Sequence, residues 1–159
     1  TPLYSSAASD VYKRQNLAGM ARLAARFVVP IMADEAINGP EDALDIARLG
    51  AADVLALKIA KSGGIYEMLR TAAVGDAAGM SLYGGTMLEG SVGSIASAHG
   101  FACLPRLSWG TELFGPLLLK DDIVANPPRY TDFEMEIPSG PGLGLELDED
   151  KLTFYRRGN

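Results

Sequence analysis

Short apolar runs recur along the chain at nearly constant intervals, and each leads into a polar residue. They cover residues 28–33, 54–57, 80–83 and 107–111, and helix-length sequence separates them. This recurrence predicts an internal repeat of strand–helix units, which is typical of a parallel α/β fold. In such folds the functional side chains lie where strands end, so the polar residues after these runs form one candidate site.

Helical spacing and end signals predict the helices between the strands. Asn16 suits the N-cap of a first short helix. Gly39–Pro40 begins a second helix, and Gly50 ends it. A third helix is expected over residues 65–78, and a fourth, of small residues, between 90 and 101. The buried stripe of the third helix is expected to contain Met68, Leu69, Ala72 and Ala73.

The two ends of the chain differ from its middle. Residues 1–15 show no periodicity and resemble translated adaptor or vector sequence, so we interpret them as a non-native leader. Residues 16–120 hold four strand–helix units, half of an eight-stranded barrel. Residues 121–159, the C-terminal tail, are rich in Pro and Gly, with short alternating pieces at 130–137 that indicate edge or hairpin strands. The tail is expected to pack onto another part of the protein.

Composition excludes several classes of function. The 159 residues are 48% hydrophobic and 21% charged, which is ordinary for a globular protein. The net charge of −6, with scattered Lys and Arg, argues against a nucleic-acid or anionic-membrane surface. No apolar run approaches the roughly 20 residues that span a bilayer. One histidine, His99, and one cysteine, Cys103, exclude a thiolate or imidazole zinc site within this chain and fit a reduced cytoplasm.

Three polar strand ends are the candidate catalytic residues. Asp34, Lys58 and Glu112 share strand parity with small neighbours, so they are expected to point towards the axis of a curved sheet. Converging carboxylates suit a hard divalent cation such as Mg²⁺ or Mn²⁺. Burial beside a cation would lower the pKa of Lys58, and apolar neighbours would raise that of Glu112. Taken singly, each residue also has an ordinary explanation as a solvated loop, a snorkelling lysine or a cap.

At these residues the chain resembles the muconate cycloisomerases, a family of the enolase superfamily. The resemblance covers residues 16–157 and includes the tail. Its motifs are Ile31-Met32-Ala33-Asp34-Glu35, Ala56-Leu57-Lys58-Ile59-Ala60-Lys61-Ser62-Gly63-Gly64, Tyr83-Gly84-Gly85-Thr86-Met87-Leu88-Glu89-Gly90 and Thr111-Glu112-Leu113-Phe114-Gly115-Pro116. The glutamate in the third motif, with the fourth motif, is more similar to enzymes for unsubstituted muconate than to the chloromuconate branch.

The resemblance implies a modified (β/α)₇β barrel and a role for each strand end. Asp34 matches the third of three carboxylate metal ligands, usually for Mn²⁺ with Mg²⁺ as the alternative, and Glu35 lies just behind it. Lys58 matches the lysine across the site from the general acid/base lysine, and Glu112 matches the acid at the end of the eighth strand. The positions near the bound substrate are matched by Thr86 and Glu89.

The implied reaction is the cycloisomerisation of cis,cis-muconate to muconolactone in catechol catabolism, through a metal-stabilised enolate. The family is cytoplasmic and tends to form homo-oligomers. Its Lys-x-Lys strand, two further metal carboxylates and most of its capping domain would lie upstream of residue 16. We therefore expect the chain alone to fold poorly, to bind Mn²⁺ weakly and to leave muconate unchanged. The alternatives are a dipeptide epimerase or an o-succinylbenzoate synthase of the same superfamily, or a non-catalytic half-barrel that acts as a binding or assembly module.

Overall fold

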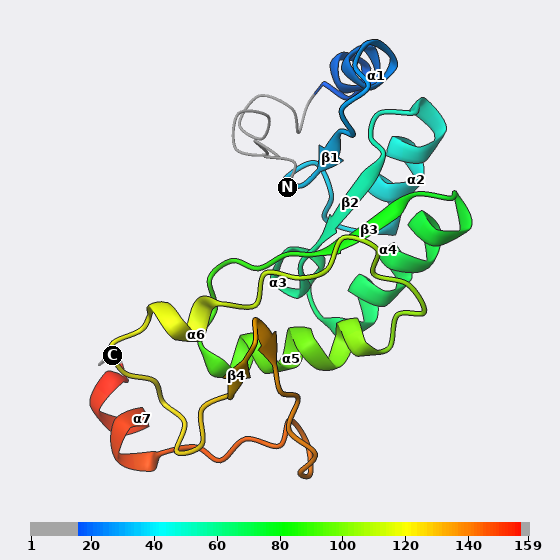
Figure 1. Ribbon diagram of the computed structural model, residues 1–159. Helices are drawn as coiled ribbons and strands as arrows, with labels where there is room; N and C mark the ends of the chain where they lie inside the picture. The colour runs from blue at the N-terminus through cyan, green and yellow to red at the C-terminus, as the bar shows by residue number, and fades with distance from the viewer. Residues whose placement is uncertain (1–15, 157–159) are drawn as a thin grey trace.

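A parallel sheet of three strands lies at the centre of the computed structural model, which describes residues 16–156 (Figure 1). The strands are β1 (Met32–Ala33), β2 (Val54–Leu57) and β3 (Ser81–Gly84), adjacent in that order. Because both pairs are parallel, the chain returns through helices to the same end of the sheet each time. The three strands therefore end at one edge, which confirms the predicted strand–helix repeat. The predicted leader, residues 1–15, lies outside the described residues.

The fourth predicted strand, over residues 107–111, is wrong in length. Only one parallel bridge forms, between Gly84 and Thr111. The backbone turns just before it, because the N–H of Gly110 donates to the carbonyl of Leu107 and Gly110 has a φ of 72°. Even so, the N–H of Glu112 donates to the carbonyl of Gly84 at 3.0 Å, so Glu112 lies beside the end of β3.

The first predicted strand, over residues 28–33, is also shorter than expected. Only its last two residues pair with β2, while Val28 and Val29 are 102% and 60% exposed. Pro30 has no N–H to donate to a neighbouring strand, which favours an irregular entry. Apolar composition alone therefore overestimated the strand.

Four helices of ten or more residues surround the sheet. Their bounds are α1 (Leu17–Arg26), α2 (Pro40–Leu49), α4 (Ile65–Ala77) and α5 (Ser91–Ala102). The predicted end signals are confirmed: the side chain of Asn16 accepts from the N–H of Gly19 at 2.7 Å, and Gly50 ends α2 in the left-handed conformation. Two short helices were not predicted, α3 (Ile59–Ser62) directly after β2 and α6 (Gly115–Leu118).

The hydrophobic core lies between the sheet and the helices α2, α4 and α5. Figure 1 shows α2 and α4 together on one side of the strands. Leu55 and Leu57 of β2 belong to this core, as does Met68 of α4, and all three are almost fully buried. The two leucines therefore pack in the core that the sheet forms with the helices. In the expected stripe of α4, however, Ala73 is exposed, and Thr71 and Gly75 are buried in its place.

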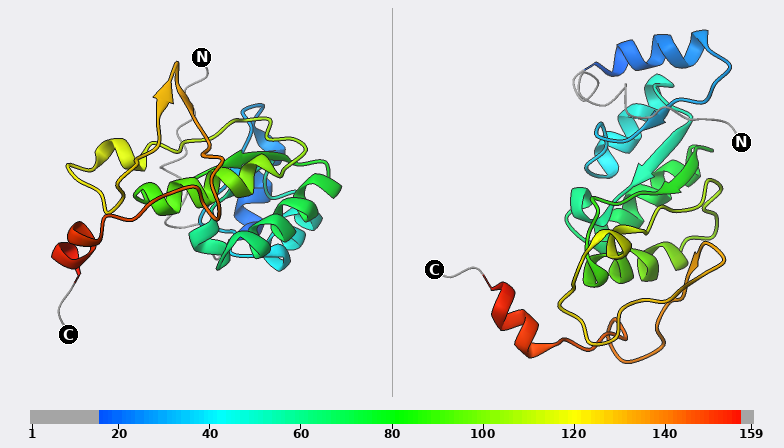
Figure 2. Two further views of the ribbon diagram at one scale, coloured as in Figure 1. Left: turned by 90° about the horizontal axis from the view of Figure 1, so that it is seen from below. Right: turned by 60° about the vertical axis from the view of Figure 1, so that its left-hand side comes forward.

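The C-terminal tail crosses back to the strand ends. Its antiparallel hairpin, β4 (Tyr130–Thr131) with β5 (Glu134–Met135), confirms the strands predicted there. The Tyr130 hydroxyl donates to the carbonyl of Leu113 at 2.6 Å, next to Glu112. A last helix, α7 (Glu149–Tyr155), was not predicted, and Figure 2 shows it standing away from the sheet.

Candidate active site at the strand ends

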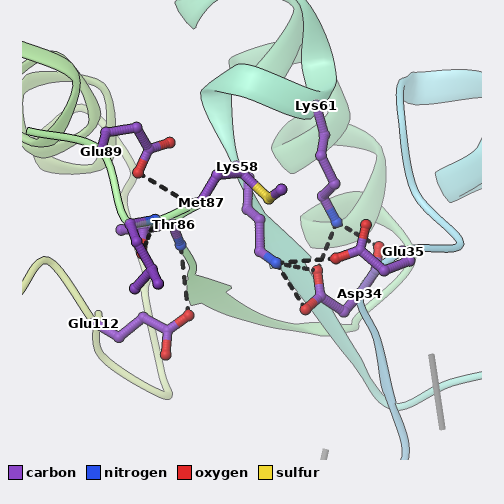
Figure 3. Close-up of polar contacts among 9 residues, drawn as sticks. Asp34, Glu35, Lys58, Lys61, Thr86, Met87, Glu89 and Glu112 are labelled. Atoms are coloured by element: carbon purple, nitrogen blue, oxygen red, sulfur yellow. Dashed lines mark hydrogen bonds and ion pairs between the residues drawn. The ribbon is translucent and has the colours of Figure 1, made fainter. Parts of the chain in front are cut away.

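Lys58 lies directly after β2 and points its ammonium group at two acidic side chains that follow β1 (Figure 3). Its Nζ lies 2.8 Å from both carboxylate oxygens of Asp34 and 3.2 Å from Oε1 of Glu35. Only 7% of the Lys58 side chain is exposed, against 18% for Asp34. The pairing register of β1 with β2 explains this contact. Met32 and Ala33 lie beside Val54 and Leu55, so the ends of the two strands come together.

Lys61 is a second lysine in this cluster, and the sequence analysis assigned it no role. It lies on α3, three residues after Lys58, so both side chains reach the same side of that turn. Its Nζ donates to Oδ1 of Asp34 at 2.6 Å and to the main-chain carbonyl of Asp34 at 2.5 Å. Its side chain is 8% exposed. The Lys-x-x-Lys spacing was the signal that could have identified it.

Burial and charge pairing shift the pKa values of this cluster in different directions. Burial raises the pKa of Asp34, but its bonds to Lys58 and Lys61 outweigh that effect and lower it overall. Burial lowers the pKa of Lys58, but the carboxylates of Asp34 and Glu35 outweigh it, so that pKa is raised. The lowered pKa predicted for Lys58 was that of a lysine beside a bound cation, and it stays a prediction. It is the pKa of Lys61 that falls, because burial outweighs its bond to Asp34 and the charge of Lys58 adds to the effect.

Glu112 faces the same strand ends from the other side of Lys58. A Cβ placed on Gly85 would lie 2.9 Å from Cε of Lys58 and 3.6 Å from Oε1 of Glu112, so both side chains border the space that Gly85 leaves open. The N–H of Thr86 lies 3.5 Å from the same oxygen of Glu112. Tyr83, which the sequence analysis did not single out, is also part of this site. Burial and then the Glu112 carboxylate raise the pKa of its phenol.

The loop after β3 holds Thr86 and Glu89, and its own polar groups bind one another. Oγ1 of Thr86 accepts from the N–H of Leu88 at 3.3 Å, and Oε2 of Glu89 accepts from the N–H of Met87 at 2.9 Å. Leu88 has a φ of 61°, which is unusual for a residue other than glycine. Oε1 of Glu89 is buried and has no hydrogen-bond partner in the described structure. In Figure 3 Glu89 points to the backbone of Met87, and Glu112 points to that of Thr86.

The donor set of this site fits one ligand position for a divalent cation. The Asp34 carboxylate is a hard oxygen ligand of the kind that Mg²⁺ and Mn²⁺ prefer. Within residues 16–156, no group of three or more His, Cys, Asp or Glu side chains is arranged to hold a metal ion. The Asp34 carboxylate can therefore supply one metal ligand, with the ammonium groups of Lys58 and Lys61 beside it. The remaining ligands would have to come from outside residues 16–156.

Comparison with known proteins places this arrangement in a family. The enolase C-terminal domain-like model matches residues 11–151. The chain belongs to the enolase C-terminal domain-like family. Enzymes of the enolase superfamily use a divalent metal ion, in agreement with the carboxylate at the end of β1. The family assignment also confirms the predicted fold class, a mixed α/β C-terminal barrel segment.

The curated relatives of this family member are cycloisomerases. The chain is 58% identical over 144 residues to muconate cycloisomerase 1 of Pseudomonas putida, and the match covers 91% of the chain and 38% of that protein. It is 42% identical over 144 residues to a chloromuconate cycloisomerase of Delftia acidovorans, covering 91% of the chain and 39% of that protein. The chain thus spans about two fifths of the length of these relatives.

Solved structures of the family have the same fold. The muconate cycloisomerase of Pseudomonas fluorescens superposes with a TM-score of 0.89 at 61% identity, over 91% of this chain and 40% of that one. A muconate lactonizing enzyme from the same organism, in complex with muconolactone, gives a TM-score of 0.88 at 61% identity, over 91% and 39% of the two chains. The resemblance noted in the sequence is therefore confirmed in three dimensions.

None of the helices among residues 16–156 has the length and apolar character needed to cross a membrane.

Proposed function

We propose that this chain forms the C-terminal part of a muconate cycloisomerase, which converts cis,cis-muconate to muconolactone. The observation that carries the proposal is the meeting of Asp34, Lys58 and Glu112 at one edge of the sheet, in a chain 58% identical to such an enzyme. These residues come from three different strand–helix units, and independent surface loops would rarely bring them together.

Each residue would have a distinct role in that reaction. Asp34 would hold one position of a divalent ion, Mn²⁺ or Mg²⁺, and Glu35 would support the neighbouring Lys58. When bound, the ion would neutralise negative charge on a substrate carboxylate. Lys58, whose raised pKa keeps it cationic, would favour negative charge developing on the substrate beside it. Glu112 borders the same open space at Gly85 as Lys58 does, where its carboxyl group could exchange a proton or a hydrogen bond with the substrate.

The loop after β3 would contact the rest of the substrate. Thr86 is 5% exposed and lies next to Glu112, and Glu89 fixes the loop through its bond to the N–H of Met87. Glu112 also lines an open pocket of about 400 Å³ together with Phe114, Tyr130 and Phe133. A small dicarboxylate would therefore meet Lys58 and Glu112 at the strand ends and the loop at their rim.

A hybrid protein tests the proposal. Residues 16–159 would replace the matching C-terminal part of the Pseudomonas putida enzyme, and loss of muconate absorbance would be followed with Mn²⁺ present. We expect turnover by the hybrid and none by the 159-residue chain alone. Lys58→Met should reduce kcat by about 10²–10³-fold, as the loss of a group that stabilises developing negative charge does. The matched control is Lys151→Met, which removes an exposed ion pair to Asp121 and should leave kcat unchanged.

The outcomes separate the candidate functions. A folded hybrid that binds Mn²⁺ but does not consume muconate would overturn the proposal, and a panel with dipeptides and the o-succinylbenzoate precursor would then test the superfamily alternatives. A folded hybrid that neither binds metal nor acts on any of these substrates would favour a non-catalytic module.

The unsubstituted substrate is the preferred one in this proposal. Identity is 58% to the Pseudomonas putida muconate enzyme but 42% to the chloromuconate enzyme. The same assay with chloromuconate decides between the two, because the proposal expects a higher kcat/KM for muconate. A cytoplasmic location and a homo-oligomeric assembly stay predictions, and sedimentation of the hybrid would test the second.

A further inference from the structure

Lys61 places a buried positive charge where the reaction has no evident use for a second ammonium group. Its side chain is 8% exposed, and a lysine is seldom buried so deeply unless it is paired. In the described part of the chain, both of its hydrogen bonds go to one residue, Asp34. The hydrogen bonds of the Lys61 ammonium group therefore serve to hold Asp34.

An exposed ion pair elsewhere in the chain, between Lys151 and Asp121, serves as a comparison for the pair of Lys61 and Asp34. Lys151 bonds Asp121 at the same 2.6 Å, but its side chain is 37% exposed and its ammonium group contacts only carboxylates, the second being that of Asp148 at 4.0 Å. Such an exposed pair contributes little to the free energy of unfolding. Lys61, in contrast, also binds the main-chain carbonyl of its partner, at 2.5 Å.

This double contact fixes the Asp34 side chain. One ammonium group holds the main-chain oxygen and Oδ1 of the same residue, so rotation about the Asp34 side-chain bonds would break a charge-assisted hydrogen bond. The second carboxylate oxygen, Oδ2, accepts from Lys58 and not from Lys61. Oδ1 of Asp34 is thereby held by both lysines, and Oδ2 is held by Lys58 at the strand ends, as Figure 3 shows.

We propose that Lys61 is a positioning residue, which fixes Asp34 so that a carboxylate oxygen is presented to the divalent ion. This inference rests on the proposed function of Asp34 as a metal ligand. Groups that orient a ligand in this way commonly contribute a factor of ten or more to metal affinity. A lysine suits the role because its three N–H donors can bind two oxygens at once.

The test is the affinity of the hybrid protein for Mn²⁺, measured from the electron paramagnetic resonance signal of the free ion. Lys61→Met should raise the dissociation constant about tenfold or more. Turnover of the variant should fall at low Mn²⁺ and recover as Mn²⁺ approaches saturation, as a loss of metal affinity requires. Lys151→Met is the matched control and should bind Mn²⁺ as the parent does. Unchanged or tighter binding by Lys61→Met would overturn the proposal, because Lys61 would then be neutral towards the metal or compete with it.

A second variant and a metal-free measurement keep the proposal testable. Should Lys61→Met fail to fold, Lys61→Gln retains a polar group on a shorter stem that does not reach both oxygens, and the same weakening is expected. A crystal structure of either variant without metal should show the Asp34 carboxylate in a new orientation, and an unmoved carboxylate would overturn the proposal. Failure of the proposed function has a different signature, which is an inactive parent hybrid that retains the contact between Lys61 and Asp34.

Discussion

Gly85 offers a direct way to displace Lys58 without changing any charged group. An added Cβ would lie 2.9 Å from Cε and 3.2 Å from Cγ of Lys58. Carbon atoms in contact prefer about 3.5–4.0 Å, so in Gly85→Ala the lysine must withdraw by roughly 0.6–1 Å. Its Nζ would then lose the 2.8 Å contact with Asp34.

The expected effect on catalysis follows from this displacement. Misplacing a catalytic group by about 1 Å can cost 10²-fold, so kcat of the hybrid should fall about 10- to 100-fold. That range equals about 1.4–2.7 kcal/mol of transition-state stabilisation. Overpacking should also lower the free energy of unfolding by about 1–3 kcal/mol. The measurements are muconate turnover under saturating Mn²⁺ and urea unfolding of the same sample.

Gly75 provides the matched control for crowding alone. A Cβ there would lie 2.6 Å from Cδ1 of Leu55, on the helix side of the sheet. We expect Gly75→Ala to lower stability, partly offset by the preference of alanine over glycine in a helix, about 1 kcal/mol. Its kcat should be that of the parent. A normal kcat in Gly85→Ala, or equal losses in both variants, would refute the inference that the open space at Gly85 sets the position of Lys58.

Three further predictions concern stability, each measured by urea unfolding of the hybrid. Asp122→Ala removes the acceptor for the N–H groups of Ser91 and Ile123, at 2.8 and 2.7 Å, and should lower the free energy of unfolding by about 1–2 kcal/mol. Asp122→Asn should lower it by less, and equal losses in the two variants would argue against a capping role for Asp122. Leu55→Ala should cost about 2–5 kcal/mol, because this fully buried side chain would leave a cavity, and a loss below 1 kcal/mol would contradict that packing. The pKa of Asp34 in the folded protein lies below its ordinary 3.8, so its contribution to the free energy of unfolding is complete above pH 3.8 and is lost as the pH falls through the folded pKa. Without metal, Asp34→Asn should not show this loss of stability in acid, and a pH dependence identical to the parent's would refute the prediction.

Much of the fold could be predicted because local signals agreed with tertiary packing. Asn16 and Gly50 mark helix ends through side-chain and backbone geometry that is written in the sequence. The buried run of β2 has apolar side chains on both faces, as an interior parallel strand requires. The edges were harder, because Val28 and Val29 have strand-forming side chains but no partner strand among residues 16–156. The short helices α3 and α6 carry too few residues for a periodic pattern.

The candidate site also has residues that the sequence predicts and a residue that it does not. Asp34, Lys58 and Glu112 were predicted because each ends a strand, and topology alone brings strand ends together. Lys61 was missed because it lies on a turn of helix whose direction depends on how α3 packs. The raised pKa of Lys58 beside Asp34 and Glu35 was not predicted, because it depends on distances to two carboxylates, which no sequence pattern supplies.

The hydrogen bond from Tyr130 to the carbonyl of Leu113 has a consequence for synthesis. The residues that line the candidate site leave the ribosome in the order Asp34, Lys58, Glu112, and the hairpin that contacts the residue after the last of them follows only afterwards. A nascent chain that has released Glu112 but not Tyr130 would hold all three charged residues without the hydrogen bond beside the third. A stop codon between Glu112 and Tyr130 would therefore keep every charged group of the candidate site and still remove a contact that supports it.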